Sequence, residues 1–145
     1  MSVSPFPTQT PLNLIMPIKP GKAGELRALL TGVSAQPGQP VERALIGLGN
    51  VHHAQFVFLE NDTRLGVLTW YDGPFEDYIL SFVEHIGGIF NAILQYIDGA
   101  DALLPVETHR GAFTEFIKLH DHKCLHAFSA YPNQRIFDIK EALGI

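Results

Sequence analysis

The sequence predicts one α+β domain, in which an antiparallel sheet packs against helices. Three observations lead to this prediction. A chain of 145 residues fits one domain. Its hydrophobic residues, 46% of the total, suffice for a core without disulfides. Apolar residues recur with a period of two in some segments and at helical spacing in others, so the order of these segments decides the fold.

The first predicted unit is a strand followed by a helix. Leu12–Ile18 alternates apolar and other residues, and Pro17, which lacks an amide donor, favours a sheet edge or a strand end. After the break at Pro20–Lys22, apolar residues recur at helical spacing. Ser34–Pro40 is typical of a loop, and we expect a short helical turn at Val41–Ile46.

The next unit is a hairpin followed by the longest helix. Val51–Glu60 and Arg64–Tyr71 are rich in β-branched and aromatic residues and are joined by turn-forming residues, which predicts two antiparallel strands. Apolar residues then step along one helical face over Phe75–Ile86. Gly87-Gly88 interrupts this pattern, but the residues up to Ile97 resume it. The helix therefore either kinks or restarts at the two glycines.

The last part of the chain predicts a loop, a helix, a strand and a helix. Asp98–His109 reads as the loop, and a shorter helix starts near Gly111. A final strand is predicted over Cys124–Tyr131, and a last helix follows from Ile136. This order corresponds to a ferredoxin-like βαββαβ sandwich with an extra helix before the last strand and a C-terminal helix.

Composition limits the classes of partner. Residues 1–11 are rich in Ser, Thr and Pro, so we expect them to form a flexible N-terminal arm and residues 12–145 to form the single domain. The arm lacks the basic start and apolar stretch of a signal peptide. A net charge of -5, with scattered Lys and Arg, argues against nucleic acid. No apolar run reaches the roughly 20 residues that span a membrane. The lone thiol of Cys124 favours a reducing compartment, so a cytoplasmic protein is expected.

Both faces of the predicted hairpin are apolar, which suggests a homodimer. A sheet with helices on one side exposes its other face unless something covers it. Alternation alone places the apolar residues in two classes. The first class is Phe56, Phe58, Leu68 and Trp70, and the second is Val57, Leu59, Leu65, Val67 and Tyr71. A second copy of the chain is therefore expected to cover the open face.

Five short motifs resemble the dimeric α/β-barrel superfamily, in which two ferredoxin-like sheets face each other. They are Pro17–Arg27, Val51–Phe56, Asp62–Leu65, Tyr71–Gly73 and Tyr78-Ile79. All but the first look like an uncharacterised bacterial branch of that superfamily. The resemblance covers most of the chain and implies a dimer. The wider superfamily includes cofactor-free monooxygenases, haem-dependent chlorite dismutases and dye-decolourising peroxidases, and small-molecule-binding proteins. Its haem enzymes use a helical histidine with which no histidine here aligns, so haem is the weaker alternative.

The function expected from these observations is small-molecule binding, with or without catalysis. A ligand would lie between sheet and helices, because aromatic walls with a few polar groups suit such a cavity. Its candidate lining is His52, His53, Phe56, Trp70, Tyr71 and Tyr78. A pocket imidazole there could move a proton or hold a ligand. The alternatives are a non-catalytic dimeric interaction protein and an oxidoreductase that uses haem or no cofactor.

The two histidines and Asp72 could instead have structural roles. Either histidine could be satisfied by neighbouring backbone at a strand end. Asp72 could orient a polar ligand together with Tyr71 or pair with Arg64, but Asp72-Gly73-Pro74 is also turn chemistry, which would place Asp72 or a neighbour at the start of the long helix as its cap.

One segment has the composition of a metal site. His120, His122, Cys124 and His126 alternate and would share one face of a strand. Imidazole and thiolate bind zinc and copper. Ligands along one straight strand, however, are spread by about 6–7 Å per pair and cannot converge on one ion. These four residues are therefore weak candidates, and no metal is predicted.

Overall fold

The computed structural model describes residues 8–35 and 40–145, and within them it confirms the α+β class. Its sheet has three antiparallel strands in the order β1-β3-β2. The strands are β1 (Gln9–Pro17), β2 (Val51–Leu59) and β3 (Arg64–Asp72). Both hairpin strands form where the sequence predicted them. β1 begins at Gln9, inside the segment expected to be an arm, and residues 1–7 of that arm lie outside the described residues.

All the predicted helices form. They are α1 (Ala23–Ala35), α2 (Pro40–Leu48), α3 (Phe75–Leu94), α4 (Arg110–His120) and α5 (Ile136–Leu143). Two short 3-10 turns, η1 (Asp101–Leu103) and η2 (Val106–Thr108), lie in the predicted loop before α4. Gly87-Gly88 lies inside the 20-residue α3, so the helix continues through the two glycines. None of the helices described is long and apolar enough to cross a lipid bilayer.

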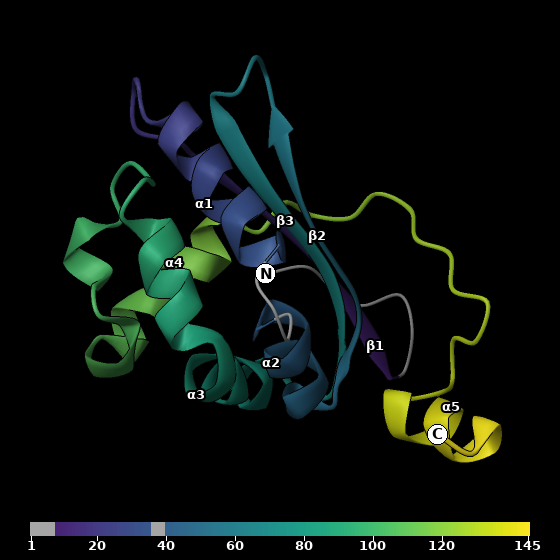
Figure 1. The fold of residues 1–145 in the computed structure, drawn as a ribbon. Coiled ribbons are helices and arrows are strands. Elements are labelled where there is room, and N and C mark those ends of the chain that lie inside the picture. Colours follow the sequence, from purple (N-terminus) through teal and green to yellow (C-terminus); the bar gives the residue numbers. More distant parts are fainter. Residues whose placement is uncertain (1–7, 36–39) are drawn as a thin grey trace.

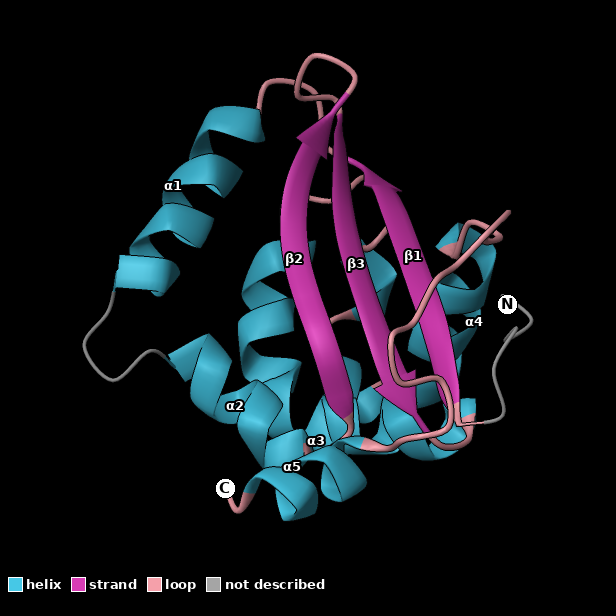
Figure 2. Cartoon of the chain, turned by 90° about the vertical axis from the view of Figure 1, so that its right-hand side faces the viewer, coloured by secondary structure: helices cyan, strands magenta, loops and turns pink. Residues whose placement is uncertain are grey.

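The core lies between the sheet and α3 and α4. Alternate residues of β1, including Leu12, Leu14 and Met16, are buried, as are Leu65 and Val67 of β3. In Figure 1, α3 and α4 lie on one side of the sheet, and the segment that follows α4 passes to the other side. Figure 2 shows α1 and α2 beside β2, at the edge of the sheet, instead of behind its centre. This placement of α1 and α2 creates the cavity described below.

The hairpin register corrects the predicted grouping of apolar residues. Phe56 lies opposite Val67, and Phe58 lies opposite Leu65, so both phenylalanines face the helices. Residues directly opposite each other in an antiparallel pair share a face. The grouping of Phe56 and Phe58 with Leu68 was therefore wrong. Alternation fixes the faces within one strand, but the turn fixes which classes combine across two strands.

The face opposite α3 and α4 carries half-buried apolar residues beside the polar residues Asn13, His53 and Gln55. The apolar residues are Ile15, Val57, Leu59, Leu68 and Trp70. We call these five residues the open face. Single exposed apolar residues are ordinary, but a contiguous group of them indicates a surface that another molecule can cover.

The predicted last strand, Cys124–Tyr131, was wrong, and the sheet therefore lacks a fourth strand among the described residues. The segment instead runs irregularly beside the free edge of β1. The amide of His122 donates to the carbonyl of Asn13 (2.8 Å), and Gln9 Nε2 donates to the carbonyl of Tyr131 (2.7 Å). Residues two apart in a strand direct their backbone groups to the same side, so Pro11, like Asn13, faces this segment. Pro11 has no N–H to donate. A regular ladder would lack that hydrogen bond.

Candidate functional site

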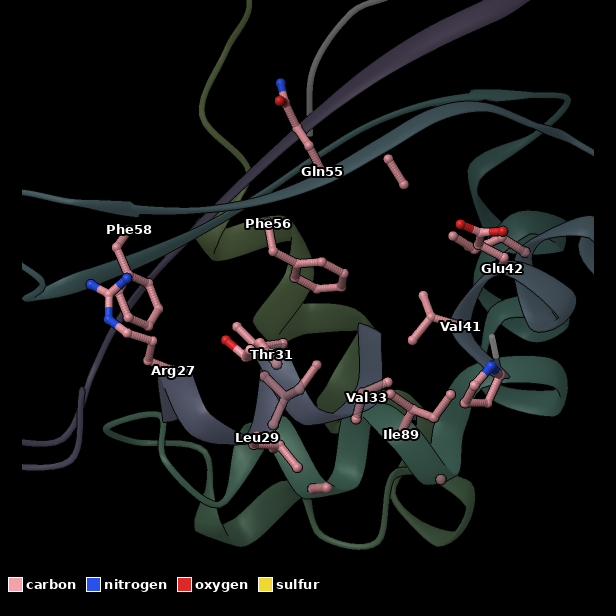
Figure 3. A pocket seen from close by; sticks show the side chains of 17 residues that line it. Arg27, Leu29, Thr31, Val33, Val41, Glu42, Gln55, Phe56, Phe58 and Ile89 are labelled. Atoms are coloured by element: carbon pink, nitrogen blue, oxygen red, sulfur yellow. The ribbon is translucent and has the colours of Figure 1, made fainter. Parts of the chain in front are cut away.

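A cavity of about 820 Å³ lies between α1, α2, β2 and α3 (Figure 3). Most of its wall is apolar. The aliphatic and aromatic side chains include Leu30, Val41, Leu45, Phe56, Ile89 and Ile93. The sequence builds this wall from the inner stripes of two short helices and one face of β2. Because α1 and α2 flank the edge strand, their stripes enclose space instead of closing on the core.

Few polar side chains line the cavity. They are Arg27, Thr31, Glu42 and Gln55. In Figure 3, Gln55 points away from the cavity, as expected from its position between Phe56 and Ala54 on the strand. Arg27 and Glu42 lie toward opposite ends, and Phe56 projects into the space between them.

The side chain of Arg27 is held in place by two contacts. Its guanidinium carbon lies 4.5 Å from the ring centroid of Phe58, and its Nη2 donates to Asp62 Oδ2 (2.7 Å). Asp62 ends a turn in which Glu60, Asn61 and Asp62 all have φ between 52° and 60°. Asn and Asp adopt this conformation more readily than most residues. The hairpin turn therefore positions the carboxylate that orients Arg27.

The structure does not bring the six predicted lining residues together. Only Phe56 lines the cavity. Tyr71 and Tyr78 are buried in the core and stack on each other, with ring centroids 4.2 Å apart and an interplanar angle of 6°. Burial raises the pKa of each tyrosine to about 12. Both phenols are therefore neutral near pH 7 and serve as core packing.

The other predicted residues lie apart from the cavity. His53 and Trp70 are directly opposite each other on the sheet, on the face that points away from the helices. His53 is exposed, whereas Trp70 is half-buried. These two residues belong with the open face and contribute nothing to the space beneath β2.

His52 and Asp72 form a buried pair. His52 Nε2 lies 2.6 Å from Asp72 Oδ1, and both side chains are 8% exposed. The other oxygen, Oδ2, accepts a hydrogen bond from the amide of Ile136 (2.7 Å) at the start of α5. The expectation that Asp72 or a neighbour caps the long helix was wrong, because Pro74 precedes α3 and no side chain caps it. Asp72 instead joins the ends of β2 and β3 to α5.

Arg64, the other predicted partner of Asp72, lies at the far end of β3. Its Nε is 3.1 Å from Glu60 Oε2. The strand rises about 3.3 Å per residue, so the two ends of β3 are too far apart for a direct pair. The predicted alternative of an Asp72–Arg64 pair was therefore wrong.

The histidine-rich segment does not converge on one point. His120 ends α4, its Nδ1 lies 2.9 Å from the carbonyl of Phe116, and its ring packs on the Phe116 ring at 4.1 Å. Cys124 Sγ lies 3.2 Å from the carbonyl of His126. Across residues 8–35 and 40–145, no three His, Cys, Asp or Glu side chains gather around a space for a metal ion.

The walls that α1 and α2 provide were not predicted from the sequence. The helical spacing of the apolar residues predicted α1, but of its three leucines Leu26 is fully buried while Leu29 and Leu30 stay half-buried. α2 has no fully buried residue. Helical periodicity shows which residues face inward, but it does not show whether the space they face is filled.

The chain matches no protein-family model, no curated protein and no solved structure. The geometry of the cavity is therefore the guide to its function.

Proposed function

We propose that the protein binds a small, mainly apolar molecule in the cavity beneath β2. The observation that carries this proposal is the cavity itself. Its volume of about 820 Å³ falls among ligand sites, which typically measure roughly 300–1,000 Å³ and combine apolar walls with a few polar groups. The proposal keeps the predicted class of function and moves the site away from Tyr71 and Tyr78.

The size of the cavity argues against an ordinary packing defect. Protein interiors contain few voids larger than a water molecule. The space between the sheet and α3 elsewhere conforms to this rule, because the void beside Tyr78 and Phe82 measures only about 10 Å³. The apolar wall now faces water, and covering it would gain about 25 cal/mol of free energy for each Å² buried. A bound apolar molecule would recover that free energy.

Gly88 offers a direct test of the proposal. It lies on α3 and lines the cavity, and a Cβ at this position would meet nothing within 4 Å. Gly88→Leu should place a side chain in the cavity without a backbone clash. Gly111→Leu is the matched control, because Gly111 is also an exposed helical glycine with open space around its Cβ and does not line the cavity.

The measurement is the binding of N-phenyl-1-naphthylamine, a neutral apolar probe whose fluorescence rises in apolar surroundings. We expect the wild type and Gly111→Leu to bind the probe alike and Gly88→Leu to bind it at least about tenfold more weakly. Equal binding by all three proteins would show that the cavity is not the site. Circular dichroism would verify that both variants are folded.

A dimeric interaction protein is the second candidate, and the open face favours it. We propose that the domain is of the ferredoxin-like kind and pairs with a second copy, as in the dimeric α/β barrels. The strand order β1-β3-β2 leaves the outer edge of β1 beside residues 122–131, where a ferredoxin-like fold has its fourth strand. Half-buried Leu68 and Trp70 would meet their counterparts across a twofold axis.

Sedimentation equilibrium tests this second candidate. Leu68→Asp places a charge on the open face, whereas the control Leu80→Asp places one on an exposed position of α3. We expect a dimer for the wild type and the control, and a monomer for Leu68→Asp. A wild type that stays monomeric at high concentration would refute the pairing and leave the cavity proposal intact.

A further inference from the structure

We infer that the cavity takes an amphipathic monoanion, an alkyl or aryl carboxylate, whose carboxylate binds Arg27 and whose apolar body lies along the α1 and α3 walls. This inference rests on the proposed binding function and names the class of ligand. Three features of the cavity lead to it: its single cation, the free donors of that cation, and the acidic groups around it.

Arg27 is the one cationic side chain among the residues described as lining the cavity. The side chain is 57% exposed and lies at one end of the cavity beside Phe58 (Figure 3), so its guanidinium stays in contact with water while the apolar walls extend away from it. An amphipathic molecule has the same division between a charged group that stays near water and a body that gains by burial.

The guanidinium is oriented before any ligand arrives. Its plane is held over Phe58 and its Nη2 by Asp62. A guanidinium carries five N–H donors, and the hydrogen bond to Asp62 uses one. The remaining donors suit a carboxylate, which binds arginine through two parallel hydrogen bonds. Little conformational entropy is then lost when the ligand binds, because the side chain is already ordered.

Charge limits the ligand to one negative charge. Asp62 offsets the charge of Arg27, so the pair attracts an anion mainly through directed hydrogen bonds. A second negative charge would add to the repulsion from Asp62 and would find no further cation among the described lining residues. A dianion such as a phosphate monoester is therefore disfavoured.

Glu42 sets the direction of the ligand. It lies at the end of the cavity away from Arg27, with Phe56 between them (Figure 3). A carboxylate at the Glu42 end would face a like charge, whereas an apolar terminus would not. The carboxylate therefore lies at Arg27 and the apolar terminus points toward α2.

Three ligands of equal chain length isolate the contribution of the head group. Decanoate, decanol and decyltrimethylammonium share a ten-carbon chain and carry a negative, a neutral and a positive head. Each would displace N-phenyl-1-naphthylamine from the wild type below its micelle concentration. We expect decanoate to bind at least about fivefold tighter than the other two, since a charge-assisted hydrogen bond exceeds the gain from a hydroxyl.

Arg27→Gln should weaken decanoate by about tenfold and leave decanol within about twofold of its wild-type affinity. Arg43→Gln is the matched control, because Arg43 is an exposed arginine of α2 that does not line the cavity. It should change neither affinity. The decanol measurement separates the loss of the carboxylate contact from any change in the wall where Arg27 packs on Phe58.

The experiments distinguish a failure of the anion inference from a failure of the proposed binding site. If decanoate and decanol bind alike, and Arg27→Gln affects them equally, the anion inference is overturned while the apolar site stands. Tighter binding of decyltrimethylammonium would also overturn it and would indicate that Asp62 or Glu42, at opposite ends of the cavity, binds the head group. If Gly88→Leu leaves all ligand binding unchanged, the cavity itself is not the site and the proposed function fails.

Discussion

The layer between sheet and helices contains two regions of similar composition and opposite packing. Beneath β1 and β3, the rings of Tyr71, Tyr78, Phe82 and Phe90 contact one another and leave a void of only about 10 Å³. Beneath β2, aromatic and aliphatic side chains line a cavity of about 820 Å³ that is open to solvent. The difference comes from the covering helices, because α3 and α4 lie across the first region while α1 and α2 flank the edge strand of the second.

We expect the packed region to contribute mainly to the stability of the fold and the cavity region mainly to ligand binding. A close-packed region gains from dispersion contacts and tolerates little change in volume. A region whose walls are half-buried contributes less to folding and leaves surface for a ligand. Composition does not distinguish the regions, since both are apolar and aromatic. Substitutions in the two regions should therefore differ in what they change.

The largest difference is expected between Tyr78→Ala and Phe56→Ala. Tyr78 is 1% exposed and stacked, so its truncation should lower the free energy of unfolding by about 3–5 kcal/mol. Phe56 is half-buried beside open space, and its truncation should cost about 1 kcal/mol while weakening probe binding. Urea denaturation followed by circular dichroism measures both. Similar losses in the two variants would contradict the division between the regions.

The packed region should also give the protein a characteristic alkaline instability. Burial raises the pKa of Tyr78 to about 12 in the folded state, above the ordinary value of 10.0. The unfolded chain therefore loses its phenolic proton first. The stabilisation from Tyr78 is complete below pH 10 and declines by about 1.4 kcal/mol per pH unit between roughly pH 10 and 12. Tyr71, whose pKa burial also raises to about 12, adds a loss over the same range.

Tyr78→Phe isolates this effect because phenylalanine cannot ionise. Urea denaturation between about pH 8 and 11.5 should show a steeper loss of stability for the wild type than for Tyr78→Phe. Tyr131→Phe serves as the control, since Tyr131 is 64% exposed, and it should follow the wild-type curve. Parallel curves for the wild type and Tyr78→Phe would mean that the tyrosine ionises equally in both states.

Asp72 closes the end of the packed region, and its loss should release the C-terminal helix. Asp72→Ala removes the acceptor for both His52 and the amide of Ile136, which should cost about 1–3 kcal/mol. The sharper readout is limited proteolysis, in which cleavage between α4 and α5 should accelerate. Asp98→Ala, at an exposed turn, is the control and should leave the cleavage rate unchanged. Unchanged cleavage in Asp72→Ala would show that other contacts hold α5.

The sequence predicted the positions of helices and strands better than it predicted which of them pair and in which register. Periodicity located α1, α3, α4 and α5, because the apolar stripe of a helix is determined within its own segment. The missing fourth strand was different, since its formation depends on the edge of β1 and on Pro11, more than a hundred residues earlier. The hairpin faces were misassigned for a similar reason. From His53 to Leu59 the register pairs each even-numbered residue with an odd-numbered one, and alternation within a strand does not contain that information.

The candidate site was the part least accessible from sequence. Aromatic residues suggested a pocket near Tyr71 and Tyr78, yet aromatic rings fill space as readily as they line it. Phe56 was the one residue predicted for the pocket that lines it. Arg27 was unremarkable in the sequence, because its role depends on Phe58 and Asp62, which only the fold brings to it.

The smallest expected effect contrasts two adjacent glycines that belong to different regions. Gly88 borders the cavity, and a Cβ there meets nothing within 4 Å. Gly88→Ala should raise the free energy of unfolding by about 0.5–1 kcal/mol, since alanine is favoured over glycine inside a helix. A Cβ on Gly87 would instead lie 2.6 Å from Glu107 Oε1 and 3.4 Å from Val106 Cγ2.

Gly87→Ala should therefore gain less than Gly88→Ala or lose stability. Glu107 would have to move, and its carboxylate accepts hydrogen bonds from Asn91 Nδ2 at 3.0 and 3.1 Å. Both substitutions make the same change in helix propensity at neighbouring positions, so the difference between their urea midpoints reports packing alone. Equal gains would show that Glu107 yields without cost and that the packed region ends before Gly87. A loss of stability in Gly87→Ala alone would show that α3 is closely packed against Val106 and Glu107 at Gly87 and faces open space at Gly88.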